Sequence, residues 1–121
     1  MHTVALTHVF ERAAADAGMS EDEIQVLVDF LAVNPTAGDA MAGTGECRKV
    51  RVAGRGKGKR GGYRTITFYT GENLPVFLIT VFGKGEKSNL SKSESNRLRD
   101  ITKAIVAEYR SRVATLARRG A

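Results

Sequence analysis

The chain has 121 residues, 42% of them hydrophobic, a formal net charge of +6 and a pI near 9.8. This size and composition fit one compact domain, residues 1–121, and exclude a disordered or multidomain chain. No stretch approaches the roughly 20 apolar residues of a membrane span, and the first residues lack the regions of a signal peptide. We therefore expect a soluble, unprocessed protein that does not enter a membrane.

The charge is unevenly distributed along the chain. Residues 1–46 contain one base and eight acids (net −7), whereas residues 47–121 contain 18 bases and five acids (net +13). This pattern predicts that the second part faces a polyanion such as nucleic acid, and that the acidic first part is mainly solvated helix surface. A single cysteine, Cys47, excludes a disulfide framework and favours a reducing compartment, which we expect to be the cytoplasm.

The N-terminal third predicts a short strand followed by two helices. Residues 3–7 suit a strand, and the Ala-rich residues 8–17 suit a helix. Ser20 and Glu23 form a capping-box pattern that predicts the start of a second helix, and the proline after Asn34 predicts its end. Its apolar residues recur at helical spacing and predict a stripe that faces the core: Ile24, Leu27, Val28 and Leu31.

A loop and a strand with two aligned cations are expected next. Residues 36–46 are small and Gly-rich, and predict a surface loop. In the following strand Val50 and Val52 would point inward, so Lys49 and Arg51 would lie together on the opposite face. A solvated strand edge, where lysine limits aggregation, explains such cations equally well.

The rest of the chain predicts a hairpin and a long helix. Residues 63–70 and 76–82 suit two strands, the second an interior one, with a turn at 71–73. Residues 83–91 suit a loop, and residues 117–121 a flexible tail. Between these lies a helix whose apolar residues recur every three or four positions: Leu98, Ile101, Ile105, Tyr109, Val113 and Leu116. The predicted fold is α+β, with a mainly antiparallel sheet, two N-terminal helices and a long C-terminal helix.

Residues 48–64 hold eight Lys or Arg and five Gly, and no acid. Glycine permits close approach of the backbone to a ligand, so we predict that residues 54–62 form a flexible basic loop that binds phosphates. The pattern Gly56-x-Gly58-x-x-Gly61 is not a dinucleotide site, because a strand and not a helix is expected after it.

Other catalytic motifs fail. The chain lacks the Walker A, GxSxG, HExxH and kinase patterns. His2 and His8 have no partners at ligand spacing, so we expect no metal site and no histidine-centred catalyst. Chemistry on a phosphodiester would therefore depend on Lys and Arg, since clustered cations stabilise the charge that develops on phosphorus. Tyr63, Phe68 and Tyr69 can stack on bases, but at strand spacing they more often pack in a core.

Four motifs occur in order: NPxxG (34–38), GTGxxRKxR (43–51), GKGKRGGYR (56–64) and GKxEKxxL (83–90). Together they resemble the RelE/HigB-type toxins of the RelE/ParE toxin-antitoxin superfamily. The resemblance implies a small α+β fold with a curved antiparallel sheet. It also implies a ribosome-dependent mRNA endonuclease that needs no metal, uses the RNA 2′-hydroxyl as nucleophile, and is inhibited by a cognate antitoxin.

The resemblance assigns roles to the basic residues. It implies that Lys49, Arg51, Arg64, Lys84 and Lys87 form the catalytic cluster, with Lys49 or Lys87 as the base and the others on the scissile phosphate. Where the family has an arginine and a tyrosine in the last motif, this chain has Gly85 and Ser91, so the resemblance assigns no role of base or of base stacking to these two positions. Contacts with the RNA backbone are expected from further cations: Arg48, Arg55, Lys57, Lys59 and Arg60.

Two alternatives remain open at this point. A ParE-like poison of DNA gyrase would use the same fold as an interaction module and would need no catalytic cations, so Lys49, Arg51 and Arg64 favour the nuclease. A plain RNA-binding protein would explain the basic run without chemistry. The implied partners of the nuclease are the ribosome with its mRNA and a HigA-like antitoxin with a helix-turn-helix domain.

Overall fold

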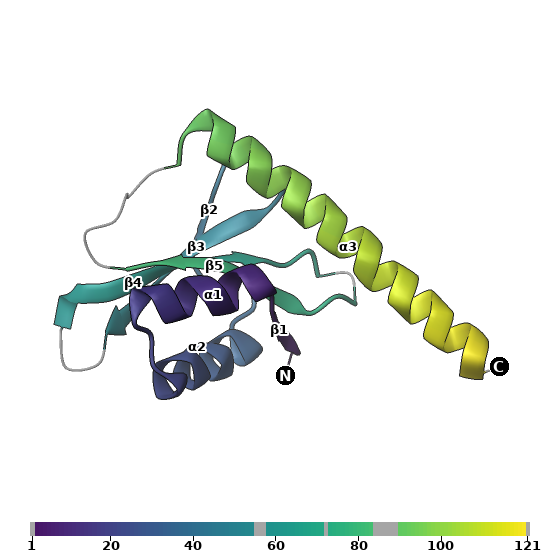
Figure 1. Cartoon of the computed structure of the whole chain (residues 1–121), viewed down its shortest axis with the longest axis horizontal. Helices are drawn as coiled ribbons and strands as arrows, with labels where there is room; N and C mark the ends of the chain where they lie inside the picture. The colour runs from purple at the N-terminus through teal and green to yellow at the C-terminus, as the bar shows by residue number, and fades with distance from the viewer. Residues whose placement is uncertain (1, 55–57, 72, 84–89, 121) are drawn as a thin grey trace.

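The computed structural model describes residues 2–54, 58–71, 73–83 and 90–120, without the side chains of residues 53, 54, 58–61 and 112–120. The chain forms a five-stranded sheet and three helices (Figure 1). In chain order the elements are β1 (Val4–Leu6), α1 (His8–Ala17), α2 (Glu21–Val33), β2 (Asp39–Ala40), β3 (Cys47–Gly54), β4 (Gly58–Phe68), β5 (Val76–Phe82) and α3 (Lys92–Gly120).

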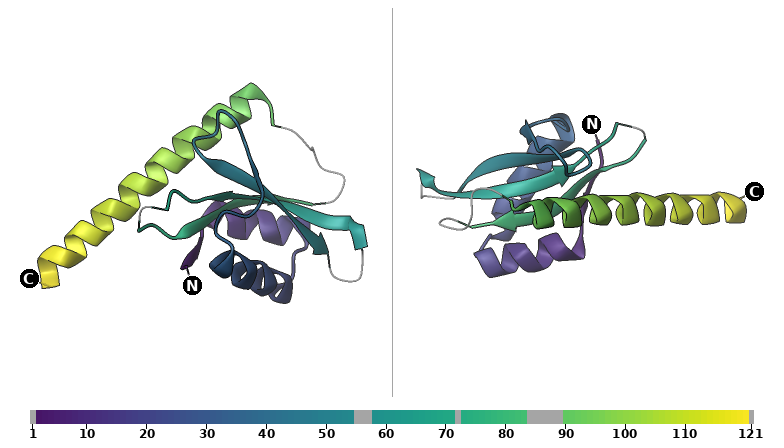
Figure 2. Two further views of the ribbon diagram at one scale, coloured as in Figure 1. Left: turned by 180° about the vertical axis from the view of Figure 1, so that it is seen from behind. Right: turned by 90° about the horizontal axis from the view of Figure 1, so that it is seen from above.

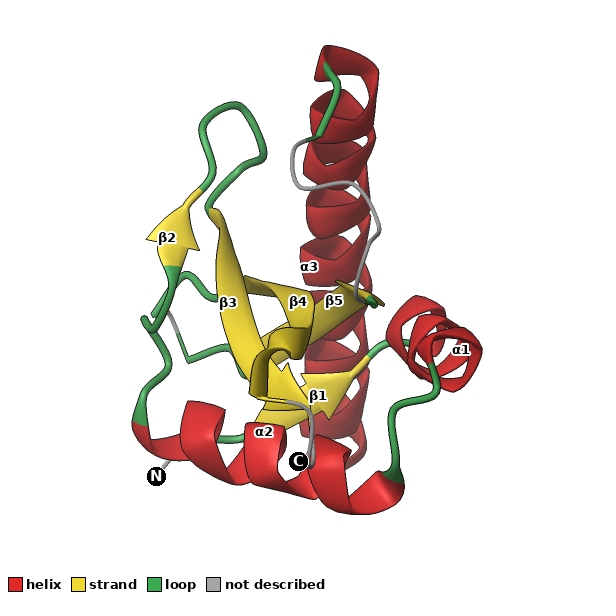
Figure 3. Ribbon diagram, turned by 90° about the vertical axis from the view of Figure 1, so that its left-hand side faces the viewer, coloured by secondary structure: helices red, strands yellow, loops and turns green. Residues whose placement is uncertain are grey.

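The strand order in the sheet is β1-β5-β4-β3-β2. β1 runs parallel to β5, and every other neighbouring pair is antiparallel. The sheet twists strongly, as Figure 3 shows from the side. The predicted α+β class, the mainly antiparallel curved sheet and the three helices are therefore confirmed.

The helices cover the two faces of the sheet separately (Figure 1). α1 and α2 pack on one face through Phe10, Leu27 and Leu31, which are buried against the inward side chains of the sheet. The first half of α3 packs on the other face, where Leu98 lies in a second apolar cluster with Ile66. Each face thus buries one cluster, as expected for an amphipathic helix laid on a sheet.

Local capping explains where α1 and α2 begin. The Thr7 hydroxyl accepts a hydrogen bond from the Phe10 amide at 3.1 Å, and Gly18 ends α1 in the left-handed conformation. In α2 the Ser20 hydroxyl accepts from the Glu23 amide at 3.1 Å, and the Glu23 carboxylate accepts from the Ser20 amide at 2.8 Å. The capping box is confirmed, and so is the end of α2 at Asn34.

The prediction that residues 36–46 are a surface loop is wrong in two respects. Asp39–Ala40 form the edge strand β2, and Thr44 is fully buried. The Thr44 hydroxyl donates to the Met41 carbonyl at 2.6 Å and accepts from the Cys47 amide at 3.2 Å. A small hydroxyl residue can pair backbone groups of a buried turn, and composition alone does not reveal this.

The turn that contains Thr44 is also held by α3. The guanidinium of Arg99 donates to the Gly43 carbonyl at 2.9 and 3.2 Å. A Cβ on Gly45 would lie 3.2 Å from the Thr102 hydroxyl, so the turn and the helix are in close contact. The turn immediately before β3 is therefore fixed to the C-terminal helix.

The predicted flexible basic loop at residues 54–62 is largely a β-hairpin. β3 extends to Gly54 and β4 begins at Gly58, and these two glycines are register partners. Residues 55–57 lie outside the described part of the chain. The register of β3 with β4 shifts between Val52 and Gly54, so this pair is offset from the rest of the ladder. Glycine is common at such irregularities, because it has no side chain to pack.

A β-bulge interrupts the pairing of β4 with β5. Ile66 pairs with Thr80 but Thr67 pairs with Leu78, so Ile79 is the extra residue on β5. A bulge places two successive residues toward the same face, and here Ile79 and Thr80 both face the α3 side. After the bulge the alternation resumes, so Val81 points to the α1–α2 cluster.

The 29-residue helix α3 extends well beyond the sheet (Figure 2). Its apolar residues pack on the sheet as far as Tyr109, whose ring meets Phe77 edge-on at 6.0 Å. Residues 117–120, expected to be part of a tail, belong to this helix. Among the described residues, no helix combines the length and the hydropathy that crossing a membrane requires.

Candidate functional site

Three predicted site residues lie together on one face of the sheet. Lys49 and Arg51 are two apart on β3 and so point to the same side, and Arg64 on β4 is the direct partner of Arg51. Side chains at opposed positions on antiparallel strands have Cβ atoms about 5 Å apart. We refer to Lys49, Arg51 and Arg64 as the cationic face.

α3 covers only part of the side of the sheet on which Lys49, Arg51 and Arg64 lie. Cys47, Ile66 and Phe68 point to this side and are buried in the cluster beneath α3. Farther along β3 and β4 the residues that point to this side are basic instead of apolar. Arg51 is exposed there, and Arg64 is half-buried. One half of this side is therefore closed by a helix, and the other half is open and basic.

The pairing of Arg51 with Arg64 is unfavourable in the isolated protein. Like charges directly opposite each other destabilise a sheet, by several tenths of a kcal/mol or more. The cost is recovered when an anion lies between them, because a guanidinium binds a phosphate with two parallel hydrogen bonds. This arrangement is typical of a site for a phosphate group.

The backbone that carries Lys49 is held from the opposite side. The Thr65 hydroxyl, fully buried, donates to the Val50 carbonyl at 2.9 Å. Gly38, the last residue of the first motif, has φ +97°, and a Cβ there would lie 2.5 Å from the Lys49 carbonyl oxygen. The motif thus contains a glycine because the chain passes directly against β3.

The structure does not bring every predicted cation to this face. Arg48 alternates with Lys49, so it points to the α1–α2 side, where its guanidinium donates to the Gly38 carbonyl at 3.4 Å. Lys84 and Lys87 lie outside the described residues, and so do Arg55, Lys57 and the side chains of Lys59 and Arg60. Their roles remain predictions.

The other groups considered from sequence serve packing. Tyr63 and Phe68 are buried in the two clusters, and burial, reinforced by the Glu23 carboxylate, raises the pKa of Tyr63. Burial raises the pKa of the Cys47 thiol to about 11, against a smaller opposing effect of its hydrogen bond with Thr44. His2 and His8 are exposed.

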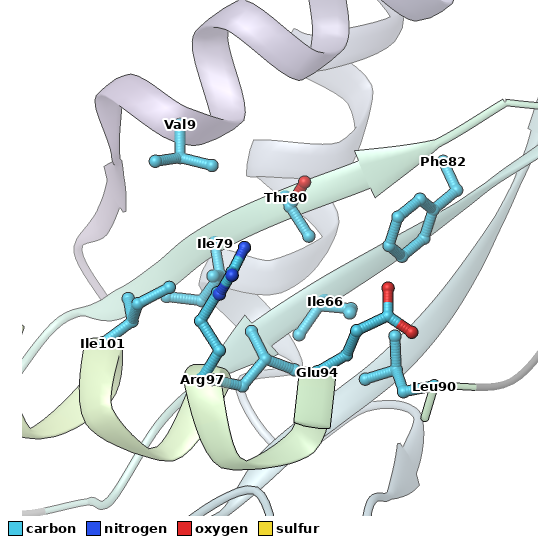
Figure 4. A pocket seen from close by; sticks show the side chains of 10 residues that line it. Val9, Ile66, Ile79, Thr80, Phe82, Leu90, Glu94, Arg97 and Ile101 are labelled. Atoms are coloured by element: carbon cyan, nitrogen blue, oxygen red, sulfur yellow. The ribbon is translucent and has the colours of Figure 1, made fainter. Parts of the chain in front are cut away.

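A pocket of about 210 Å³ lies beside the cationic face, between α1, β5 and the first turns of α3 (Figure 4). Phe82 and Thr80 of β5 line it, together with Arg97 of α3. Sequence analysis missed this pocket, because Arg97 reads as one of many cations on a helix surface and Phe82 as one more apolar residue of a strand. No sequence pattern predicts the β-bulge that places Ile79 in the wall of the pocket.

The comparison with protein families agrees with these features. A family model described as the RelE toxin of the RelE/RelB toxin-antitoxin system matches residues 2–121. The chain belongs to the RelE toxin family. The resemblance found from four sequence motifs is thereby confirmed, and the RelE match extends over both the helices and the cationic face.

The RelE family to which the chain belongs defines its general biological role. The protein is a toxin of a toxin-antitoxin system, and its partner is a cognate antitoxin. The RelE toxin presents an open basic surface on one side of its sheet and acidic helices on the other.

Proposed function

We propose that this toxin is a metal-independent endoribonuclease that cleaves mRNA in the A site of the translating ribosome. The observation that supports this most directly is the pairing of Arg51 with Arg64 on the open half of the sheet, beside Lys49. A gyrase-binding module has no need for this unfavourable pair. Action on ribosomes would place the protein in the cytoplasm.

The cationic face supplies the groups that such a cleavage needs. A base removes the proton of the RNA 2′-hydroxyl, whose oxygen then attacks the adjacent phosphorus while the bond to the 5′-oxygen breaks. The products are a 2′,3′-cyclic phosphate and a 5′-hydroxyl, which takes up a proton. Arg51 and Arg64 hold the phosphate and stabilise its added charge, and Lys49 or Lys87 acts as the base.

The decisive experiment maps cuts in a reporter mRNA by primer extension, in a translation extract with and without ribosomes. We expect the wild-type protein to cut within codons only during translation, and a matched ribosome-free control that contains EDTA to show no cuts. Arg64→Ala should lower the cutting rate about 100- to 1,000-fold, as for the loss of one group that stabilises transition-state charge.

Two controls separate catalysis from folding. Lys103→Ala removes one cation from an exposed position of α3 away from the cationic face, and it should cut at the wild-type rate. Arg64→Ala should keep or slightly raise the melting temperature, because it removes a like-charge pair. Wild-type cutting by Arg64→Ala, or inhibition of gyrase supercoiling without any cuts in mRNA, would refute the proposed function.

We also propose that the antitoxin is HigA-like, with a helix-turn-helix domain of its own and an acidic segment that covers the cationic face. Charge complementarity supports the second part, since Arg51 is exposed and lies opposite a second arginine. If the antitoxin covers this face, Arg51→Glu should weaken the complex by increasing its dissociation rate. A complex with unchanged affinity would place the antitoxin elsewhere.

A further inference from the structure

The pocket between α1, β5 and α3 is continuous with the cationic face. Two rows cross the sheet from β3 to β5: Lys49 pairs with Ile66, which pairs with Thr80, and Arg51 pairs with Arg64, which pairs with Phe82. Ile66, Thr80 and Phe82 all line the pocket. Since neighbouring strands lie about 4.8 Å apart, Phe82 is one strand from Arg64 and about 10 Å from Arg51.

The β-bulge shapes this pocket. Because Ile79 is the extra residue on β5, Ile79 and Thr80 both point to the α3 side, and both line the pocket. Without the bulge, one of them would point into the α1–α2 cluster. Bulges occur next to functional sites more often than elsewhere, where they redirect a side chain.

The wall of the pocket combines a half-buried aromatic ring with a few polar groups. Figure 4 shows the Phe82 ring at one end and the Arg97 side chain rising from α3 toward β5 near Ile79 and Thr80. Arg97 is exposed, so its guanidinium can donate to a ligand. The Glu94 carboxylate at the rim accepts from the Ser91 amide at 2.9 Å and caps α3.

The dimensions favour a single ring system. Pockets that enclose a drug-sized ligand have roughly 300–1,000 Å³, so a volume of about 210 Å³ suits one flat group better than a whole nucleotide. Aromatic side chains stack on nucleobases, and arginine donates hydrogen bonds to base edges. A strand whose phosphate lies between Arg51 and Arg64 would pass Phe82 within one nucleotide.

We infer that this pocket receives the base of the nucleotide next to the scissile phosphate, with Phe82 as the stacking surface and Arg97 as a hydrogen-bond donor to the base edge. The inference rests on the proposed function and adds a selectivity element to it. The cationic face binds any phosphate, whereas the pocket distinguishes one base from another.

The test compares cleavage profiles over many transcripts in a translation extract, with cuts located by sequencing of the new 5′ ends. Phe82→Leu keeps the apolar volume without the ring and should lower cutting roughly 10-fold, as expected for loss of one stacked base, whereas Phe82→Tyr should retain it. Arg97→Ala should reduce the preference among the four bases at one position beside the cut. Lys103→Ala, the same type of change farther along α3, should alter neither.

The possible results are separable from those that test the nuclease. If the wild-type protein cuts mRNA but Phe82→Leu and Arg97→Ala keep its rate and its base preference, the pocket does not bind a base and the proposed function stands. If these variants keep the profile but lose the co-expressed cognate antitoxin, the pocket is a protein docking site instead. If the wild-type protein makes no cuts at all, both proposals fail together.

Discussion

Gly38 shows how a residue without a side chain determines the position of the strand that carries Lys49. At φ +97° it adopts a conformation that other residues rarely take, and a Cβ would lie 2.5 Å from the Lys49 carbonyl oxygen and 2.8 Å from a methyl group of Val50. Contacts this short between real atoms are not tolerated. Any larger residue must therefore displace β3, and Lys49 with it.

Gly38→Ala should accordingly destabilise the protein more than the addition of one methyl group would suggest. We expect a loss of about 2–4 kcal/mol in the free energy of unfolding, from the positive φ together with the clash, and a matching loss of mRNA cutting in the fraction that remains folded. Urea unfolding followed by circular dichroism measures the first. Gly18→Ala is a useful control, because it has a similar φ of +75° but no atom within 4 Å of its Cβ.

β4 illustrates how one strand can contain both a satisfied and an unsatisfied hydroxyl. Thr65 and Thr67 are both fully buried. The Thr65 hydroxyl donates to the Val50 carbonyl, whereas the Thr67 hydroxyl has no hydrogen-bond partner among the described residues. A buried polar group without a partner costs free energy that a methyl group in its place would not.

The same substitution at these two positions should therefore have opposite effects. Thr65→Val should lower the free energy of unfolding by about 1 kcal/mol, and Thr67→Val should raise it by about 1 kcal/mol. Both changes in the free energy of unfolding are measured from the midpoints of urea titrations, provided that the dependence of this free energy on urea concentration is the same in each variant. Equal signs would mean that the β-propensity of valine, and not hydrogen bonding, decides stability at these positions.

The elements that sequence patterns predicted are those stabilised by local interactions. The capping box at Ser20, the helical stripe of α2 and the alternation of Val50 with Lys49 each depend on neighbours a few residues away. The β2 strand and the bulge at Ile79 depend on pairing with another strand, and no local pattern encodes them. Thr44 bonds to the nearby Met41 and Cys47, but the composition of its segment does not reveal that it is buried. The Gly-rich segment was misjudged for a related reason: its composition suggests a loop, whereas Gly54 and Gly58 pair across the two strands after a shift in register that no local pattern encodes.

The same distinction applies to the site. Lys49, Arg51 and Arg64 were predictable, because a family motif and strand alternation both identify them. Arg48 is also basic and adjacent in sequence, yet strand alternation places it on the other side of the sheet, where it donates a hydrogen bond to the Gly38 carbonyl. The pocket was not predictable, because it forms only where α3 packs against the bulged strand β5 in the folded protein.

The whole molecule is electrically two-sided. Its acids gather in the first 46 residues, which include α1 and α2 on one face of the sheet, and Lys49, Arg51 and Arg64 occupy the other face. A charge distribution of this kind orients a polyanion before contact and speeds its association. The net charge of +6 therefore understates the electrostatic field that a polyanion would meet at the basic side.

Binding of a short single-stranded RNA should therefore weaken steeply with salt. Three phosphate contacts give a slope of about −2 in a plot of log affinity against log salt, and Arg64→Ala should reduce its magnitude by about 0.7. Fluorescence anisotropy with a labelled oligonucleotide measures both. Asp29→Asn on α2 changes the net charge by one unit on the opposite face and should leave the slope unchanged; an equal effect of the two variants would contradict local recognition.

The bonds from Arg99 to the Gly43 carbonyl have a mechanical consequence. Arg99 belongs to the helix that closes the apolar half of the sheet, and Gly43 to the turn from which β3 starts. The first residues of β3 are thus anchored by a segment more than 50 positions later in the chain. Until α3 is in place, the strand that carries Lys49 and Arg51 lacks this anchor, so the docking of α3 on the sheet completes the alignment of these cations.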